Sequence, residues 1–167
     1  MSEKPPAVVG VGNILMGDDG VGPRTVDLLR SRGEGRRADL LDAGLAFGEV
    51  LCDLEPEAPL VVIDAVRGIG EPGSIYRLDA SDIDVTTGSM ARAVSLHELS
   101  VLPVLRMEAL AGRKFRDVTI FGVEPQVVEW SETLSPVVVE AMERLADAIG
   151  SFLDERATRE GQRSQGQ

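Results

Sequence analysis

The sequence has few of the residues from which proteins build disulfides and histidine-rich metal clusters. Its 167 residues include one cysteine, Cys52, and one histidine, His97. A single cysteine cannot form an internal disulfide, which predicts a protein of the reducing cytoplasm. No apolar run is long enough to span a bilayer, and the first residues lack the apolar core of a signal peptide, so no membrane partner is expected.

The chain also lacks the excess of positive charge that nucleic acids and anionic lipids attract. Its formal net charge is -11, and a strongly negative protein repels phosphate-rich partners. We therefore expect no nucleic-acid partner. A metal ion or a basic peptide segment is compatible with this charge.

Several catalytic motifs are missing. The sequence contains no HExxH zinc-protease motif, no GxSxG nucleophile elbow and no Walker-type phosphate loop. The glycine turn Gly10-Val11-Gly12 departs from the dinucleotide-binding GxGxxG pattern, because Leu15 occupies the place of the third glycine. These absences count against a nucleotide-binding domain.

What the sequence does contain is a regular alternation of strand-like and helix-like patterns. We predict strands at residues 7–12, 38–42, 59–64, 74–78 and 117–122, and helices at residues 21–32, 47–54, 95–111 and 136–153. The alternation predicts a single α/β domain over residues 1–153, a three-layer sandwich in which a mostly parallel, twisted sheet of about five strands has helices on both faces. The strand at 74–78 is expected at an edge, where it can pair antiparallel, and the polar tail at 154–167 is expected to be disordered.

Candidate chemistry lies where strands end and helices begin. Asp18 and Asp19 follow the first strand, Asp64 ends the apolar strand PLVVID, and His97 opens a later helix. If the first and third strands are neighbours, Asp19 and Asp64 converge at one edge of the sheet. Two carboxylates and one imidazole suit a divalent metal such as nickel or zinc. Taken singly, each acid is equally explained as a helix cap or turn former, and the histidine as a surface residue.

The same residues fall within four stretches that resemble the nickel–iron hydrogenase maturation endopeptidases. These stretches are GVGNILMGDDGVG at 10–22, VVIDAV at 61–66, SLHELS at 95–100, and FGVEPQ at 121–126 with the later LSP at 134–136. The resemblance implies that Asp19, Asp64 and His97 form the catalytic and metal-contacting set. It also suggests Gly12, Asn13 and Asp18 as substrate-binding residues, and a variable specificity loop at 67–73.

The resemblance implies an enzyme that removes a C-terminal extension from the precursor of a hydrogenase large subunit after nickel insertion. Nickel would arrive with the substrate, bind weakly or transiently, and act as the recognition element. The enzyme is expected to act as a monomer. In one mechanism the nickel polarises the scissile carbonyl or activates a water, whereas in another Asp19 or Asp64 acts as a general base. A non-enzymatic nickel-binding or nickel-delivery accessory protein on the same fold is the alternative function.

Overall fold

The structure is a computed structural model that describes residues 4–68, 70–79, 100–115 and 117–164. In chain order its elements are β1 (Ala7–Val11), the 3-10 helix η1 (Gly17–Gly20), α1 (Val21–Ser31), the 3-10 helix η2 (Glu34–Arg36), β2 (Asp39–Gly44), α2 (Phe47–Asp53), β3 (Leu60–Ala65), β4 (Ile75–Asp79), α3 (Val101–Leu110), β5 (Val118–Val123) and α4 (Pro136–Ser164). The predicted strands and helices are confirmed in type where the structure describes them, with small shifts at their ends except in α4, which ends 11 residues later than predicted.

The five strands form one sheet in the order β2-β1-β3-β5-β4. The pairs β1–β2, β1–β3 and β3–β5 are parallel, and β4 pairs antiparallel with β5 at the edge. The predicted α/β class, the mostly parallel sheet and the antiparallel edge strand are therefore confirmed. β2 lies on one side of β1 and β3 lies on the other, so the direction in which the chain adds strands to the sheet reverses between β1 and β3.

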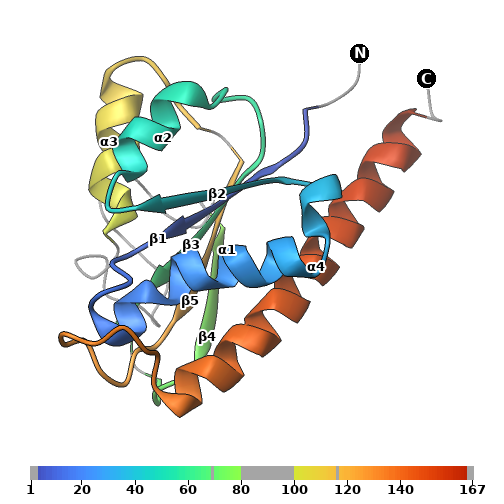
Figure 1. Cartoon of the computed structure of the whole chain (residues 1–167). Coiled ribbons are helices and arrows are strands. Elements are labelled where there is room, and N and C mark those ends of the chain that lie inside the picture. The colour runs from blue at the N-terminus through green and yellow to red at the C-terminus, as the bar shows by residue number, and fades with distance from the viewer. Residues whose placement is uncertain (1–3, 69, 80–99, 116, 165–167) are drawn as a thin grey trace.

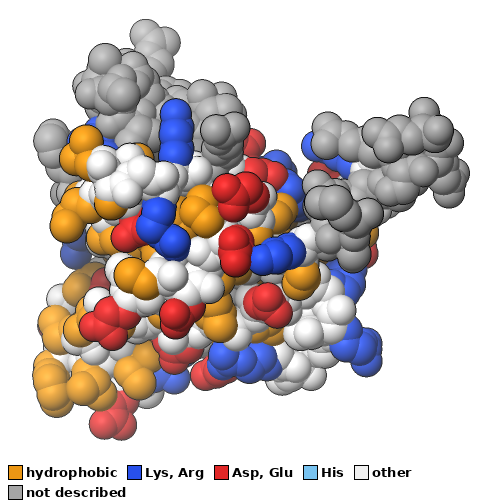
Figure 2. Space-filling model, turned by 90° about the horizontal axis from the view of Figure 1, so that it is seen from above, with side chains coloured by type: hydrophobic (Ala, Val, Ile, Leu, Met, Phe, Trp, Pro, Cys, Tyr) orange, Lys and Arg blue, Asp and Glu red, His pale blue; other side chains and the backbone are white. Residues whose placement is uncertain are grey.

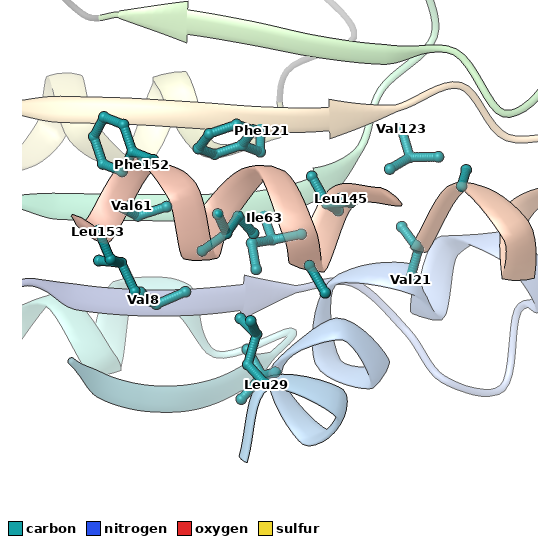
Figure 3. Packing of buried hydrophobic residues seen from close by; sticks show 14 of the residues in the cluster. Val8, Val21, Leu29, Val61, Ile63, Phe121, Val123, Leu145, Phe152 and Leu153 are labelled. Atoms are coloured by element: carbon teal, nitrogen blue, oxygen red, sulfur yellow. The ribbon is translucent and has the colours of Figure 1, made fainter. Parts of the chain in front are cut away.

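Helices cover both faces of this sheet (Figure 1). Alternate residues of the buried strands point to opposite faces, so Val9 and Val62 pack towards α2 and α3 while Val8 and Val61 pack towards α1 and α4. Figure 3 shows the second of these cores, in which Leu145 of α4 lies over Ile63 of β3. Continuous apolar strands such as LVVIDA are the expected consequence of burial on both faces.

The C-terminal end of the chain differs from the prediction. We expected a disordered tail from residue 154, whereas α4 continues to Ser164. The residues after Leu153 make contacts that composition alone does not reveal. Asp154 forms an ion pair with Arg37, and Arg156 forms one with Asp117 while its guanidinium lies 5.6 Å from the centre of the Phe152 ring. These contacts and the good helix formers Glu, Arg and Ala extend the helix.

Replacing Arg156 by Ala should loosen this extension, because the ion pair with Asp117 and the packing on Phe152 are both removed. We expect a loss of about 1 kcal/mol in the free energy of unfolding and faster amide exchange in the last turns of α4. Hydrogen exchange read by mass spectrometry measures both. Arg159→Ala, an exposed position on the same helix, is the control, and equal exchange in the two variants would show that Arg156 does not hold the helix.

Two features of the sequence analysis lie outside the described residues. They are the start of the helix predicted at 95–111 and the candidate metal ligand His97 within it; the described part of this helix is α3, preceded by Ser100. Within the described residues, no helix combines the length and the apolar character needed to cross a bilayer.

Candidate active site

The two predicted acids meet at the carboxyl ends of β1 and β3. Asp19 lies in η1, which follows β1, and Asp64 is the fifth residue of β3. These strands are neighbours and parallel, so both acids are at the same edge of the sheet. This is also where the strand order reverses, the position at which open α/β sheets form ligand sites.

Glycines allow η1 and α1 to approach these strand ends closely. Gly12 has a φ of 130°, and a Cβ atom there would lie 1.9 Å from the carbonyl oxygen of Asp19. A Cβ atom at Gly22 would lie 2.3 Å from the carbonyl oxygen of Val11 and 2.5 Å from that of Ile63. Glycine is required at both positions because two backbone segments touch. The N–H of Gly12 donates to the carbonyl of Gly44 at 2.9 Å, so this N–H already has an acceptor within the protein.

Asp19 is the accessible member of the acidic pair. It is partly buried, and its Oδ2 accepts a hydrogen bond of 2.8 Å from the backbone N–H of Asn13. The Oδ1 of Asn13 in turn accepts from the N–H of Leu15 at 3.0 Å. Asn13 therefore orients the Asp19 carboxylate through its backbone, and its side-chain oxygen shapes the turn that carries both residues.

Asp64 is the buried member of the pair. Its side chain accepts a hydrogen bond of 2.7 Å from Oγ of Ser100, and the residue is 3% exposed. The pKa of Asp64 is raised from 3.8 to about 7, mainly by burial and, to a smaller extent, by the negative charge of Asp19. The hydrogen bonds with Ser100 and with the backbone of Ala65 lower the pKa and offset part of this effect. A carboxyl group poised near neutrality is suited to proton transfer at physiological pH.

Asp18 has a different place from the one predicted. We expected it to contact substrate, but the residue is fully buried. Its carboxylate accepts hydrogen bonds from the backbone N–H groups of Gln126, Val127 and Ser135 and from Oγ of Ser135, at 2.7 to 2.9 Å. All four donors belong to the segment between β5 and α4. Asp18 therefore fixes that segment against η1, and its carboxylate is not open to a ligand.

Glu124 holds the predicted specificity loop at 67–73. It is buried at the end of β5, and its Oε2 accepts hydrogen bonds from the N–H of Gly68 at 2.7 Å and from the hydroxyl of Tyr76 at 2.6 Å. The hydroxyl of Tyr76 also accepts from the N–H of Gly70 at 2.8 Å. One carboxylate thus ties the loop that follows β3 to β4 and β5.

The third predicted ligand, His97, is outside the described residues. Within the described ranges, no group of three His, Cys, Asp or Glu side chains is close enough together to hold a metal ion. From this part of the chain, Asp19 and Asp64 provide two carboxylate groups as ligands. The donor set they offer suits a borderline or hard divalent ion.

A comparison with protein families identifies the chain. The sequence model of the family described as hydrogenase maturation protease matches residues 23–151. The chain belongs to the hydrogenase maturation proteases. Its relatives are proteolytic enzymes, and it is an enzyme of the same kind.

Characterised relatives and solved structures agree with this family. The chain is 29% identical over 150 residues to the hydrogenase 2 maturation protease of Escherichia coli (strain K12), covering 89% of this chain and 90% of the relative. The crystal structure of a hydrogenase 2 maturation peptidase from a Thaumarchaeota archaeon is 32% identical, with a TM-score of 0.69 over 90% of this chain and 99% of the other. The hydrogenase maturating endopeptidase HybD from E. coli is 26% identical, with a TM-score of 0.73 over 92% and 94%.

For this maturation protease, sequence reasoning missed two residues that organise the site, Ser100 and Glu124. Ser100 closes the SLHELS stretch and donates to Asp64, and Glu124 lies in FGVEPQ and anchors the loop at 67–73. Both lie in stretches that carried the family resemblance. No pattern within those stretches indicated which distant side chain each residue would contact.

Proposed function

We propose that this protein removes a C-terminal extension from the precursor of a hydrogenase large subunit, and that it acts only on precursor that carries nickel. The nickel is part of the substrate and is recognised by Asp19, Asp64 and His97. We place the reaction in the cytoplasm and assign it to the monomer. The proposal is supported above all by the pairing of Asp19 with Asp64 at the strand-order reversal, in a chain of the maturation protease family.

The chemistry of this pair supports a transient contact with a metal that arrives from outside. Asp19 is partly accessible, whereas Asp64 is buried beside it. A site that holds a metal tightly needs several well-oriented ligands, each supported by hydrogen bonds. A protease with a permanently bound metal could not use the nickel of the precursor to distinguish nickel-loaded from nickel-free substrate. Weak coordination by oxygen ligands is compatible with selection of the nickel-loaded precursor over the nickel-free one.

The raised pKa of Asp64 supports a role for this residue in proton transfer. With a pKa near 7, its carboxyl group is divided between protonated and ionised forms at physiological pH. A divalent ion nearby favours the ionised form. Arrival of nickel-loaded precursor therefore provides a carboxylate at the site, which can contact the ion or accept the proton of an attacking water.

The deciding experiment is intact-mass spectrometry of a hydrogenase large-subunit precursor from the source organism, before and after incubation with this protein. The precursor is supplied in nickel-loaded and nickel-free forms. We expect one C-terminal peptide to be lost from the nickel-loaded form only. Each large subunit that the organism makes is tested in turn.

Two results would contradict the proposal. Equal trimming of the nickel-free form would show that nickel is not the recognition element. Failure to trim any nickel-loaded large subunit, together with nickel binding by the protein alone, would favour a nickel-binding accessory protein. Competition of a nickel chelator with the purified protein distinguishes the second case directly.

A further inference from the structure

An exposed group of apolar side chains lies beside the candidate active site. Trp130 is 76% exposed and Ile14 is 48% exposed, and Leu15, Val127 and Val128 are exposed as well. We refer to these five residues as the apolar patch. Trp130 is the only tryptophan of the chain, and large aromatic side chains are costly to leave in water unless they have a partner.

The five residues belong to two loops that lie side by side. The N–H of Gly17 donates to the carbonyl of Ser131 at 2.8 Å, and the N–H of Ser131 donates to the carbonyl of Leu15 at 3.0 Å. The N–H of Asp18 donates to the carbonyl of Val127 at 3.0 Å. The loop before α1 and the loop before α4 are together at the lower left of Figure 1. In Figure 2, which views the molecule from above, hydrophobic side chains are numerous along the left edge and charged ones are mixed over the rest of the described surface.

The apolar patch is held in place before any partner arrives. The buried carboxylate of Asp18 accepts hydrogen bonds from the N–H groups of Gln126 and Val127, directly beside Val128. A surface that is already ordered loses little conformational entropy on binding, which favours affinity. An exposed tryptophan among aliphatic side chains, on a backbone held by these hydrogen bonds, has the composition of a binding hot spot.

The apolar patch is continuous with the candidate active site. Ile14 follows Asn13, whose backbone N–H binds the carboxylate of Asp19. Asp18, the residue next to Asp19, binds the loop before α4 through the N–H of Val127. A polypeptide whose scissile bond lies at Asp19 would therefore meet the patch with the adjoining part of its surface.

We propose that the apolar patch docks the folded body of the protein substrate, while the extension to be removed lies at Asp19 and Asp64. This inference rests on the proposed function. The matching face of the substrate is apolar, with lysine or arginine side chains at its border, because Glu129 and Glu132 are exposed among and beside the patch residues. Substrate specificity thus depends on a surface outside the catalytic residues.

The charges argue against a second copy of this chain as the occupant. A symmetric contact between two copies through the apolar patch would bring Glu129 and Glu132 of both molecules into one interface. The net charge of -11 adds repulsion between copies. A substrate surface with basic residues at its border would avoid the repulsion between the acids at the apolar patch and would instead attract them.

The test compares Trp130→Ala and Trp130→Glu with the wild-type protein, using nickel-loaded large-subunit precursor as the probe. We expect the KM for precursor to rise about tenfold or more while kcat stays within about twofold, because the substitution removes binding and leaves the acids unchanged. Leu110→Glu is the matched control, since Leu110 is an apolar residue of α3 that is 89% exposed. Thermal unfolding of each variant shows that it is folded.

Binding is measured separately, so that docking and cleavage are judged independently. In an Asp19→Asn background, which prevents turnover, Trp130→Glu should weaken precursor binding about tenfold or more. If wild-type protein binds precursor in a Trp130-dependent manner but cuts nothing, docking stands and the proposed function fails. Unchanged binding and KM in Trp130→Glu would overturn docking, as would wild-type dimers in sedimentation that this substitution dissociates.

Discussion

Asp64→Asn is expected to abolish processing and, at the same time, to make the protein more stable at neutral pH. Processing should fall by about 10²- to 10⁴-fold, the usual contribution of a positioned proton acceptor. The gain in stability follows from burial. Asp64 is 3% exposed and faces the negative charge of Asp19, so the ionised side chain is unfavourable in the folded protein, whereas a neutral asparagine of the same shape is not.

The pH dependence of stability provides the measurement. The folded protein holds the Asp64 proton with a pKa of about 7, against an ordinary value of 3.8. Between these values the folded state binds a proton that the unfolded chain has released, so the free energy of unfolding falls as the pH rises from about 4 to about 7. The full contribution is about 4 kcal/mol at most, from about three pKa units. Above pH 7 it changes no further.

Urea unfolding of wild-type protein and Asp64→Asn at several pH values between 4 and 8 isolates this contribution, since the other titrating groups are common to both. The difference in stability should grow with pH in favour of Asp64→Asn. Asp19→Asn is the comparison: it also removes processing, but it relieves only the smaller charge effect and should stabilise less. Parallel pH profiles for wild-type protein and Asp64→Asn would show that the pKa of Asp64 is the same in the folded and the unfolded protein.

Asp18→Ala, in contrast, is expected to destabilise the protein severely. Its removal leaves the N–H groups of Gln126, Val127 and Ser135, which share this fully buried carboxylate, without their acceptor. Each unsatisfied buried donor costs about 1–3 kcal/mol, so a total loss of about 3–5 kcal/mol in the free energy of unfolding is reasonable for a broken buried network. Asp18→Asn should restore little, because its NH₂ group would face these donors.

Urea unfolding of the two variants tests this expectation, and Asp27→Ala provides the control. Asp27 is an exposed acid of α1 that pairs with Arg30 at 2.8 Å, and its loss should cost about 0.5 kcal/mol or less. Processing by the Asp18 variants should fall as well, because Asp19 is the next residue of the same 3-10 helix. An Asp18→Ala variant as stable as wild-type protein would mean that the network contributes nothing to folding.

The placement of Asp19 and Asp64 could be predicted from the sequence, whereas the placement of Asp18 could not. The apolar run of β3 and the acid at its end are local, so the strand, its burial and the place of Asp64 were predictable. The convergence of Asp19 with Asp64 followed from the parallel order of β1 and β3, which the strand–helix alternation suggested. The inward direction of Asp18 was not predictable, because its hydrogen-bond donors begin 108 residues further along the chain.

The same limit explains the error at the C-terminus. Residues 154–164 are polar, and polar composition without a hydrophobic core indicates disorder. The helix persists because Asp154 and Arg156 find partners in Arg37 and Asp117, which lie far away in the sequence. Composition reports the cost of ordering a segment, but the distant partners that offset it depend on the completed fold.

The hydrogen bonds of Asp18 also determine how this protein can be re-engineered. The loop before α1 and the loop before α4 share one buried carboxylate and a set of backbone hydrogen bonds, so they constitute one transplantable module although more than a hundred residues of sequence separate them. A chimera that takes one loop from a relative and keeps the other would disturb the hydrogen bonds that the two loops share. Retargeting the enzyme to another precursor therefore requires both loops to be exchanged as a pair.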